Sequence, residues 1–438
     1  MENPIAQKST NQATPLGMHP MLIGEITPEL SDLATDLTRA GNLLSIGLPV
    51  QTLASLAELT RLMNCYYSNL IEGHKTKPHD IDKAMRGGGE TPSPIPNDPD
   101  GQKLLKLALA HIECQAWIDN LYASGKLPDP ASIDFICEVH RRFYNKLPSE
   151  FLDICDGRLS RTMVAGRMRR DKEDVVVGQH VPPCGGAAVD AFMQEYQKQY
   201  STLRKIGSSQ RLFGIAAAHH RLLYIHPFDD GNGRVARLVS HAMMLDAGMG
   251  ACGLWSISRG LARGLRSDAP SLPKFLKQFS SVSEPGQYKF MMAHADMPRM
   301  GDLDGRGALS QKRLQEFCEW FLCVAYDQVH FMHSRSGLLN LEANLQKLYI
   351  QRRNLDPRCG KILGEIARLG QLERGSVKVL SGVSTRTATD LTATLIKDGI
   401  VRSDSAKAPL RLHFSPDAAE ILFPSFFSVE ALIEANPS

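Results

Sequence analysis

The sequence predicts a mainly α-helical protein with more than one domain, and three observations lead to this expectation. A chain of 438 residues that is 43% hydrophobic has enough apolar material for more than one sizeable core. Before residue 357, apolar residues recur mostly at steps of three and four, which is the spacing of amphipathic helices. From 357 to 438 the order of elements changes to three short helices and two candidate strands, so we expect a second domain there.

The first region is expected to be helical after an N-terminal arm. Residues 1–45 are rich in Asn, Thr, Pro and Gly and have weak periodicity, which predicts a partly ordered arm. An amphipathic helix is predicted from Leu53 to Leu70, ending near Gly73, and a loop is predicted at 86–101. Further helical patterns occur at 102–124, 131–145, 187–203, 209–224 and 232–247, and at 310–349 within a predicted connector, 301–356.

One stretch of this region favours strands over helix. Between 161 and 183, three successive valines, Val175 to Val177, are bounded by Gly166 and Gly178. β-branched runs bounded by glycine are typical of short strands. We therefore expect a small β-hairpin at 161–183.

The C-terminal region, 357–438, has the pattern of a winged helix-turn-helix domain. Helices are predicted at 361–369, around 376–380 and at 385–398, followed by strands at 400–401 and 410–414. Residues 357–414 carry ten Lys or Arg and five Asp or Glu, and this local positive charge is compatible with DNA binding. The predicted recognition helix offers only Arg386 beside Asp390 near its start, so a protein-interaction module is equally compatible.

Composition excludes several classes of protein. The net charge of +3 is too small, at this size, to imply nucleic acid as the main partner. The nine cysteines are an odd number without C-x-x-C spacing, which favours reduced thiols. We find neither a signal peptide pattern nor an apolar run long enough for a membrane span. A cytoplasmic protein without a membrane partner is expected.

The segment Tyr224-Ile225-His226-Pro227-Phe228-Asp229-Asp230-Gly231-Asn232-Gly233-Arg234-Val235-Ala236-Arg237 concentrates the groups of a phosphate site. Glycines at 231 and 233 permit backbone N–H groups to point at an anion, and the helix predicted to begin there adds the positive end of its dipole. Arg234 and Arg237 are three residues apart and reach the same side of that helix. The segment therefore predicts a polyphosphate ligand.

Two further side chains of the segment supply chemistry. Asp230 is a hard oxygen ligand suited to a Mg²⁺ that bridges phosphates. His226 titrates near neutrality and can act as a general base. Other nucleotide motifs do not compete, because the sequence has no G-x-x-x-x-G-K-[ST] and no G-x-G-x-x-G after a strand.

Residues 226–237 match every fixed position of H-x-F-x-[DE]-G-N-G-R-x-x-R, and the chain therefore resembles the Fic (filamentation induced by cAMP) family. The resemblance implies a Fic-type helical bundle as catalytic domain, 46–300. It also implies a protein adenylyltransferase, in which the histidine deprotonates a target Tyr, Thr or Ser hydroxyl that attacks the α-phosphate of ATP. His226 takes that role, Phe228 is the structural anchor and Asp230 the Mg²⁺ ligand. The ATP phosphates would be bound by Gly231, Asn232, Gly233, Arg234 and Arg237.

The intact Gly-Asn-Gly core favours AMP transfer over the other reactions of the family. Relatives that move a γ-phosphate carry a lysine within that core. Phosphorylation, another nucleotidyl transfer and phosphocholine transfer remain the alternatives, as does a regulatory protein dominated by the winged helix. The sequence does not identify the target protein, for which the chain itself is one candidate, nor the hydroxyl that is modified, nor whether a homodimer forms.

The stretch Ser68-Asn69-Leu70-Ile71-Glu72-Gly73 resembles the [ST]-x-x-x-E-[GN] motif of the family's inhibitory helix, here 53–73. The resemblance implies that Glu72 pairs with Arg237 and takes the place of the γ-phosphate, with Ser68 and Gly73 completing the motif. The helix C-terminus is electrostatically unfavourable for a carboxylate, which favours a specific cationic partner.

The hairpin at 161–183 resembles the family's flap, which docks the target peptide by strand addition. Val177, Gly178, Gln179 and His180 would form its docking edge, although His180 fits a structural role as well. One departure from the family follows Ser258 to Arg263, because the tyrosine expected within a few residues comes only at Tyr288. We interpret 266–286 as an insertion, so the sequence does not predict which residues form the adenine side of the pocket.

Overall fold

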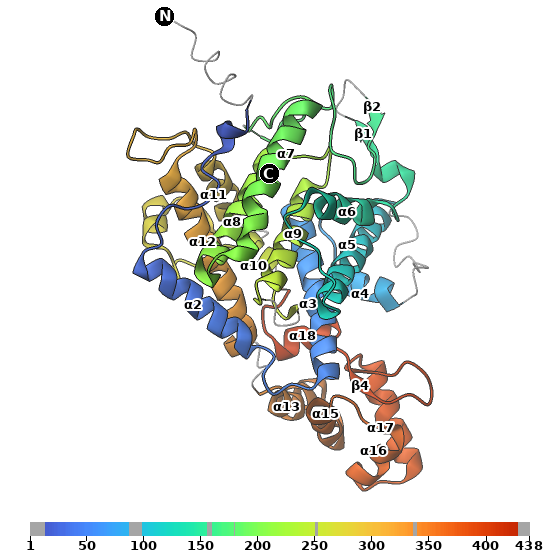
Figure 1. The fold of residues 1–438 in the computed structure, drawn as a ribbon. Coiled ribbons are helices and arrows are strands. Elements are labelled where there is room, and N and C mark those ends of the chain that lie inside the picture. Colours follow the sequence, from blue (N-terminus) through green and yellow to red (C-terminus); the bar gives the residue numbers. More distant parts are fainter. Residues whose placement is uncertain are drawn as a thin grey trace, which may run out of the picture.

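The computed structural model describes residues 14–86, 99–155, 160–178, 180–249, 253–335 and 340–427, and this part of the chain is mainly helical (Figure 1). The α-helices up to residue 330 are α2 (Pro28–Leu43), α3 (Val50–Ile71), α4 (Pro78–Arg86), α5 (Pro99–Ala123), α6 (Ile133–Tyr144), α7 (Gly186–Tyr200), α8 (Ser208–Ile225), α9 (Asn232–Asp246), α10 (Ile257–Arg263), α11 (Gln287–Ala295) and α12 (Gln311–His330). After residue 340 follow α13 (Leu341–Asn344), α14 (Ile350–Arg353), α15 (Arg358–Leu369), α16 (Arg374–Ser381), α17 (Thr385–Lys397) and α18 (Pro416–Leu422).

The strands are few and short. Among the described residues, β1 (Asp153–Cys155) pairs antiparallel with β2 (Ser160–Thr162), and β3 (Val401–Arg402) pairs antiparallel with β4 (Arg411–Leu412). The mainly helical class expected from apolar periodicity is thus confirmed.

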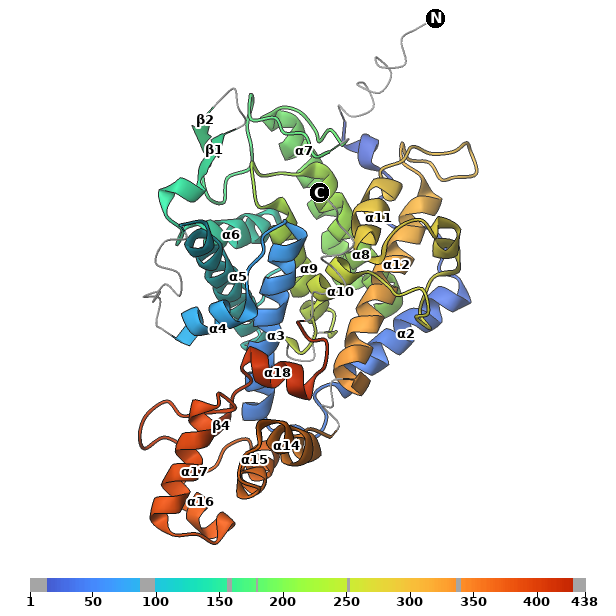
Figure 2. The same cartoon turned by 180° about the vertical axis from the view of Figure 1, so that it is seen from behind.

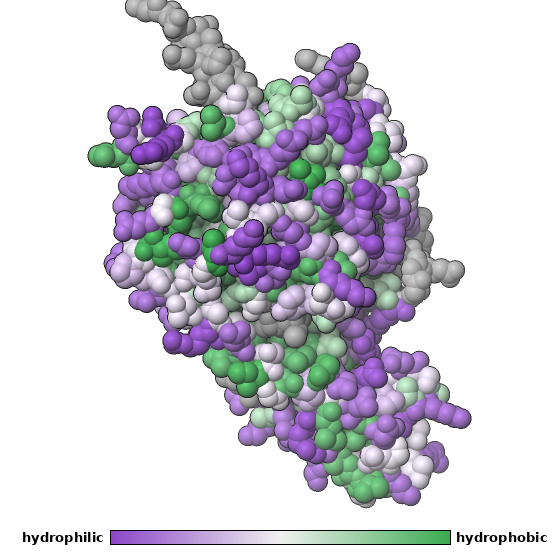
Figure 3. All heavy atoms as spheres, viewed as in Figure 1, coloured by the Kyte–Doolittle hydropathy of each residue, from purple (hydrophilic) through white to green (hydrophobic). Residues whose placement is uncertain are grey.

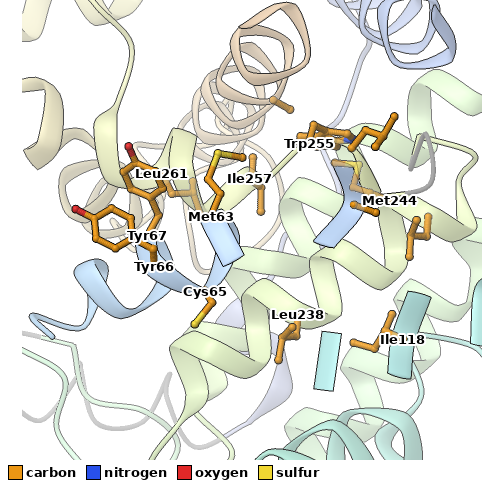
Figure 4. Close-up of a cluster of buried hydrophobic side chains, with 14 of the residues drawn as sticks. Met63, Cys65, Tyr66, Tyr67, Ile118, Leu238, Met244, Trp255, Ile257 and Leu261 are labelled. Atoms are coloured by element: carbon orange, nitrogen blue, oxygen red, sulfur yellow. The ribbon is translucent and has the colours of Figure 1, made fainter. Parts of the chain in front are cut away.

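The antiparallel pair α8 and α9 lies at the centre of the helical body. Helices α5 and α6 contact one side of α9, and α12 and α7 contact α8, as the two opposite views show (Figures 1 and 2). Helix α3 packs on α10 and α5. Apolar side chains from these elements share one core, in which Met63, Tyr66 and Tyr67 of α3 lie near Leu261 of α10 (Figure 4). The loop between α8 and α9 therefore connects two largely buried helices.

The residues from 358 onward form a C-terminal unit, in which α15 to α17 and the ribbon of β3 and β4 project from the helical body while α18 packs back against α4 (Figures 1 and 2). Three helices, α15 to α17, precede the ribbon of β3 and β4, in the order that the sequence predicts for a winged helix-turn-helix. A hydrogen-bonded bridge between Leu372 and Leu410 links the start of the second helix to the ribbon. Apolar side chains gather on the surface of this unit (Figure 3), where Leu369 and Val379 are exposed. Its identity as a winged helix stays a prediction.

The arm predicted for residues 1–45 is different in the structure. Residues 1–13 lie outside the described part, but 28–43 form the helix α2, which packs against α12 and α8. The Thr27 hydroxyl caps its start by accepting a hydrogen bond from the Leu30 N–H. Leu30, Ala34 and Leu37 are buried at helical spacing. Polar residues between them weakened the periodicity, so the sequence prediction was wrong here.

The hairpin predicted at 161–183 is also corrected. The regular two-stranded ribbon lies earlier, at 153–162, where β1 and β2 pair antiparallel. Around the three valines the chain forms only one isolated bridge, between Val177 and His180, across Gly178 with φ 61°. Val176 and Val177 are exposed, so the β-branched run predicted an extended segment correctly but not a paired one.

The predicted insertion, 266–286, forms a loop whose two ends meet. The Gln287 side-chain amide accepts a hydrogen bond from the Leu265 N–H (2.9 Å) and donates one to the Leu265 carbonyl (2.8 Å). Gly264 adopts φ 67°, and a Cβ there would clash with the Glu284 carbonyl. Tyr288 therefore enters the core directly after this closure.

Two properties bear on the predicted class of protein. Within the part of the chain that the structure describes, we find no helix with the length and apolarity needed to cross a bilayer. Seven cysteines there are free thiols, among them the buried Cys65, Cys114 and Cys318.

Candidate active site at the start of helix α9

The site is built on the turn between α8 and α9. His226 ends α8 in a left-handed conformation, with φ 50° and ψ 61°, which is uncommon for a residue other than glycine. The buried Arg169 stabilises this turn because it donates to the carbonyls of His226 (2.8 Å) and Ile225 (3.2 Å). The Arg169 N–H also donates to the Pro227 carbonyl (2.8 Å).

The His226 imidazole is a neutral base at physiological pH. Burial lowers its pKa to about 4, and Arg169 acts in the same direction. Its Nδ1 is buried without a hydrogen-bond partner among the described residues. An unprotonated imidazole can accept a proton from a hydroxyl brought to it.

Phe228 and Asn232 fix the loop between the two helices. The Phe228 ring is fully buried and stacks on His140, with ring centroids 4.0 Å apart. The Asn232 side chain accepts from the Phe228 N–H (2.9 Å) and donates to the Phe228 carbonyl (2.7 Å). Both polar atoms of Asn232 are therefore engaged within the loop. Only its backbone N–H, at the start of α9, remains suited to bind an anion.

Asp230 presents a carboxylate at the mouth of the site. It accepts a hydrogen bond from the Tyr144 hydroxyl (2.8 Å), and its carbonyl lies 3.2 Å from His140 Nε2. Burial acts to raise the pKa of Asp230, but Arg234 and the Tyr144 hydroxyl outweigh this effect and hold it below the usual range. Next to it, Gly231 has φ 80°, and a Cβ there would lie 2.6 Å from the Tyr144 hydroxyl. This position therefore requires glycine.

The residues fit a Mg²⁺ that is bound mainly through a phosphate ligand. Among the described residues, no group of three metal-ligating side chains is present. Mg²⁺ commonly uses one or two carboxylates and takes its other ligands from phosphates and water. Asp230, ionised and at the mouth of the site, is the carboxylate that would serve.

Two buried arginines extend from the first turns of α9. Arg234 donates to His74 Nδ1 (3.1 Å) and stands 5.7 Å from the Phe143 ring centroid. Among the described residues no carboxylate lies within ion-pair distance of it. Arg237 donates to the Ser68 hydroxyl (2.9 Å), the Ser68 carbonyl (3.2 Å) and Glu72 Oε1 (2.6 Å).

Glu72, at the C-terminal end of α3, brings its carboxylate to the first turn of α9. A Cβ on Gly233 would clash with Glu72 Oε1 and come within 3.1 Å of an Arg237 nitrogen, so the carboxylate lies directly against the glycine. Burial acts to raise the pKa of Glu72, but Arg237 and then Arg234 outweigh it, and the pKa is lowered. Gly73, with φ 82°, turns the chain away immediately afterwards. An anion thus already contacts the positive end of this helix.

The predicted docking edge lies on the surface beside the turn. Val176 is 70% exposed and Val177 40% exposed, and Gln179 lies outside the described residues. His180 Nε2 bonds the Tyr224 carbonyl (2.7 Å), and Nδ1 lies 3.6 Å from Asp296. His180 thus links the extended segment to the last turn of α8.

Tyr288 lies on the far side of Arg237 despite the insertion before it. It is buried, and its hydroxyl bonds His219 Nε2 (2.8 Å). Burial raises the pKa of Tyr288 to about 12, which Arg237 partly opposes. Since the ends of 266–286 meet, the insertion leaves this tyrosine at the wall of the site.

Sequence reasoning missed three residues that hold the loop. They are Tyr144, His140 and Arg169, all buried and all outside the 226–237 motif. His140 accepts from the Gly166 N–H through Nδ1 (2.7 Å), so its Nε2 carries the proton that faces Asp230. The signal that was available is the concentration of cations at 161–170, since four arginines close to a loop require partners.

Comparison with known proteins supports a family assignment for part of the chain. Residues 130–244 match the family model described as Fic/DOC family. The protein adenylyltransferase Fic of Nematostella vectensis is 32% identical over 188 residues, covering 42% of this chain and 37% of that protein. That of Drosophila ananassae is 35% identical over 118 residues, covering 27% and 20%. The matches therefore span well under half of these relatives' length.

A solved structure gives a weaker likeness over more of the chain. The crystal structure of a Fic family protein from Desulfovibrio desulfuricans G20 is 15% identical, with a TM-score of 0.47, over 89% of this chain and 98% of that one. The family-model match runs from just before α6 almost to the end of α9 and thus includes the whole turn, whereas α3 and the C-terminal unit lie outside it.

Proposed function

We propose that this chain, which carries a Fic/DOC family domain, is a protein adenylyltransferase that moves AMP from ATP to a hydroxyl side chain of a target protein. The observation that carries the proposal is the start of α9, where a neutral imidazole, an ionised carboxylate and two buried guanidinium groups face one anion position. The relatives named protein adenylyltransferase add to its support.

His226 would act as the general base. The target hydroxyl oxygen forms a bond to the α-phosphorus of ATP, the bond from that phosphorus to the bridging oxygen of the β-phosphate breaks, and pyrophosphate leaves. The proton of the hydroxyl passes to the His226 imidazole, which is unprotonated because burial lowers its pKa to about 4. Arg169 and Asn232 keep the imidazole in position through the backbone of the loop.

The phosphates would be bound by the first turn of α9. Backbone N–H groups at 231–233 and the guanidinium groups of Arg234 and Arg237 provide positive charge in a largely buried place, where it stabilises developing charge most effectively. Mg²⁺, when bound, would neutralise phosphate oxygens, and Asp230 is the side chain that would hold it.

Glu72 would inhibit the reaction by occupying the position of the outer phosphate. Its carboxylate already contacts Gly233 and Arg237, so a γ-phosphate would compete for the same guanidinium. We call residues 68–73 the inhibitory turn. ATP could bind with the turn in place only with its α-phosphate misaligned for attack. The same carboxylate would further orient a water molecule that removes AMP from modified targets.

The predicted docking edge, which begins at Val177, would dock the target as an added strand, because Val177 forms only one isolated bridge among the described residues and its side chain is exposed. The chain itself is one such target, and a homodimer would allow modification between copies. A cytoplasmic location would supply ATP and protein hydroxyls together.

The C-terminal unit would be a winged helix-turn-helix module for DNA or a protein partner. A gel-shift with the full chain and duplex DNA separates these two partners. Salt-sensitive retardation would favour DNA, and an unshifted duplex would leave the protein-binding role.

Labelled ATP tests the reaction type. Glu72→Gly protein is incubated with Mg²⁺ and ATP labelled at either the α or the γ position. We expect protein-bound label only from the α position. Label from the γ position alone would contradict AMP transfer and indicate phosphorylation, and label from neither would leave the chain without transferase activity on itself.

A further inference from the structure

Helix α3, which ends in the inhibitory turn, is held at its other end by the C-terminal unit. The Ser55 hydroxyl donates to the Leu412 carbonyl of β4 (2.7 Å). One turn along, the Glu58 carboxylate receives both guanidinium nitrogens of Arg402 from β3, at 2.6 and 2.9 Å. Bidentate pairs of this kind fix orientation as well as distance.

A second contact lies directly before the inhibitory turn. The Tyr67 hydroxyl donates to the Phe426 carbonyl (3.1 Å), and the Tyr66 ring packs edge-on against Phe427, with centroids 5.8 Å apart. Both tyrosines are buried, and Figure 4 shows them side by side on α3. The next residue is Ser68, which Arg237 binds through two atoms.

The chain that follows the inhibitory turn is held by the same unit. Asp82 of α4 lies 3.6 Å from His413 Nε2, beside β4, and α18 packs against α4. Residues 68–73 are thus bracketed by α3 before them and α4 after them. Both helices rest on the C-terminal unit, which has no described contact of its own with the first turn of α9.

From these contacts on both sides of residues 68–73 we infer that the C-terminal unit, 358–427, holds the inhibitory turn in position through α3 and α4 and determines how firmly Glu72 occupies the site. We call this unit the mount of the inhibitory turn. The inference rests on the proposed function only for its effect on AMP transfer. An α-helix transmits a displacement along its axis with little bending, so a shift of β3 and β4 at residues 55–58 reaches residues 68–72 through α3. A partner that changes the packing of the unit would therefore change the inhibition.

The contacts suit an adjustable mount. The Glu58–Arg402 pair is partly exposed, and its side chains are 29% and 37% accessible, so its rupture leaves no buried charge. The Ser55 contact is a neutral hydrogen bond to a backbone carbonyl. The ion pair contributes little to global stability because it is partly exposed, and the buried Ser55 hydrogen bond contributes about 1 kcal/mol, so both can break while the fold persists.

The test is a double variant in the full chain, Ser55→Ala with Arg402→Ala. The matched control is Arg368→Ala, which removes an exposed arginine of the same unit that pairs only with Glu365. We expect amide hydrogen exchange to accelerate at 66–74 in the double variant but not at 232–246. AMP transfer should rise roughly fivefold or more, the lower end of measured couplings between sites. The control should match the parent in both measurements.

Combining these changes with Glu72→Gly separates the mount from other effects. Without Glu72 the mount has nothing to hold in the site, so the combined variant should be no more active than Glu72→Gly alone. Parental exchange at 66–74 in a folded double variant would overturn the inference. If Glu72→Gly itself transfers no AMP, the proposed function fails, and the exchange measurement still decides on the mount. Should the double variant not fold, Tyr67→Phe is measured in the same way; it removes the hydroxyl that donates to Phe426 and accepts a 3.5 Å hydrogen bond from Arg263.

Discussion

The turn at 226–237 and the inhibitory turn at 68–73 meet at one guanidinium, but they are held in different ways. The first is tied by Arg169 to three carbonyls, by Asn232 to both backbone atoms of Phe228 and by aromatic stacking on His140. The second contacts the site through hydrogen bonds from Arg237 and through the Glu72 carboxylate, which lies against Gly233 and belongs to a side chain that is 31% exposed.

The difference indicates a preformed site with a removable block. Breaking the first turn would unpair several buried polar groups, each costing about 1–3 kcal/mol. Moving the Glu72 side chain breaks one partly exposed ion pair, and a phosphate can replace the carboxylate at the same guanidinium. Under the proposed function, catalysis and its inhibition would thus depend on separate parts of the chain.

The strongest change to the first turn is His226→Ala. It should lower AMP transfer by about 10²- to 10⁴-fold, the usual contribution of a general base, while ATP affinity measured by titration stays near the parent value. His79→Ala, an exposed histidine of α4, is the control. Transfer above a tenth of the parent rate would remove His226 from the role of base.

The corresponding change to the second turn is Glu72→Gly, which should raise auto-modification roughly tenfold or more. Glu72→Gln keeps the size of the side chain and should release part of this increase, since it removes the charge that binds Arg237. Arg237→Ala should not activate, because it removes the partner of Glu72 and the ligand of the phosphate together. Equal activity of parent and Glu72→Gly proteins at saturating ATP would sink the autoinhibition proposal.

Asn232→Ala tests how strongly the turn at 226–237 is held, compared with the turn at 68–73, through the free energy of unfolding. We expect it to lower the free energy of unfolding by about 1–3 kcal/mol, because the buried Phe228 N–H and carbonyl lose their partner. Urea denaturation measures this loss. Ser68→Ala, at the other turn, removes one hydroxyl and should cost less. A fully stable Asn232→Ala protein would show that the side chain does not hold the loop.

The smallest effect is expected from pH. With Glu72→Gly protein at saturating ATP and Mg²⁺, AMP transfer should change by less than about twofold between pH 8 and pH 5.5, and then fall towards pH 4, because a base is active only above its pKa. A decline centred near pH 6.5 would mean that the His226 imidazole titrates as in water.

The free energy of unfolding should also decrease as the pH falls. Burial lowers the pKa of His226 and His140 to about 4, and of His111 and His219 to about 3. Below pH 6.5 these histidines bind protons in the unfolded chain but stay neutral in the folded chain, so the stability of the fold declines as the pH falls from 6.5 towards 4. Thermal unfolding at a series of pH values checks this decline.

Sequence reasoning succeeded where local pattern and chemistry coincide. The start of α9 follows from two glycines and two arginines at fixed spacing, and its position in the structure agrees with the prediction. The sequence did not predict the role of the Asn232 side chain. Its amide forms hydrogen bonds with the Phe228 backbone inside the loop, and only the folded structure shows these contacts.

The failures have physical causes as well. Residues 28–43 become helical because Leu30 and Leu37 find a surface on α12 and α8, and such packing overrides weak local preference. Within the described part of the chain, the valine run forms only the isolated bridge between Val177 and His180, and the regular ribbon forms instead between β1 and β2. Arg169 escaped notice because the sequence does not distinguish it from the other three arginines at 161–170, although its contacts span both halves of the site.

The closure of Leu265 on Gln287 makes the length of the chain between them independent of the active site. A polypeptide whose two ends are held next to each other can gain or lose residues while those ends remain adjacent in space. Foreign sequence inserted between residues 266 and 286 would therefore leave Tyr288 and Arg237 at their present positions.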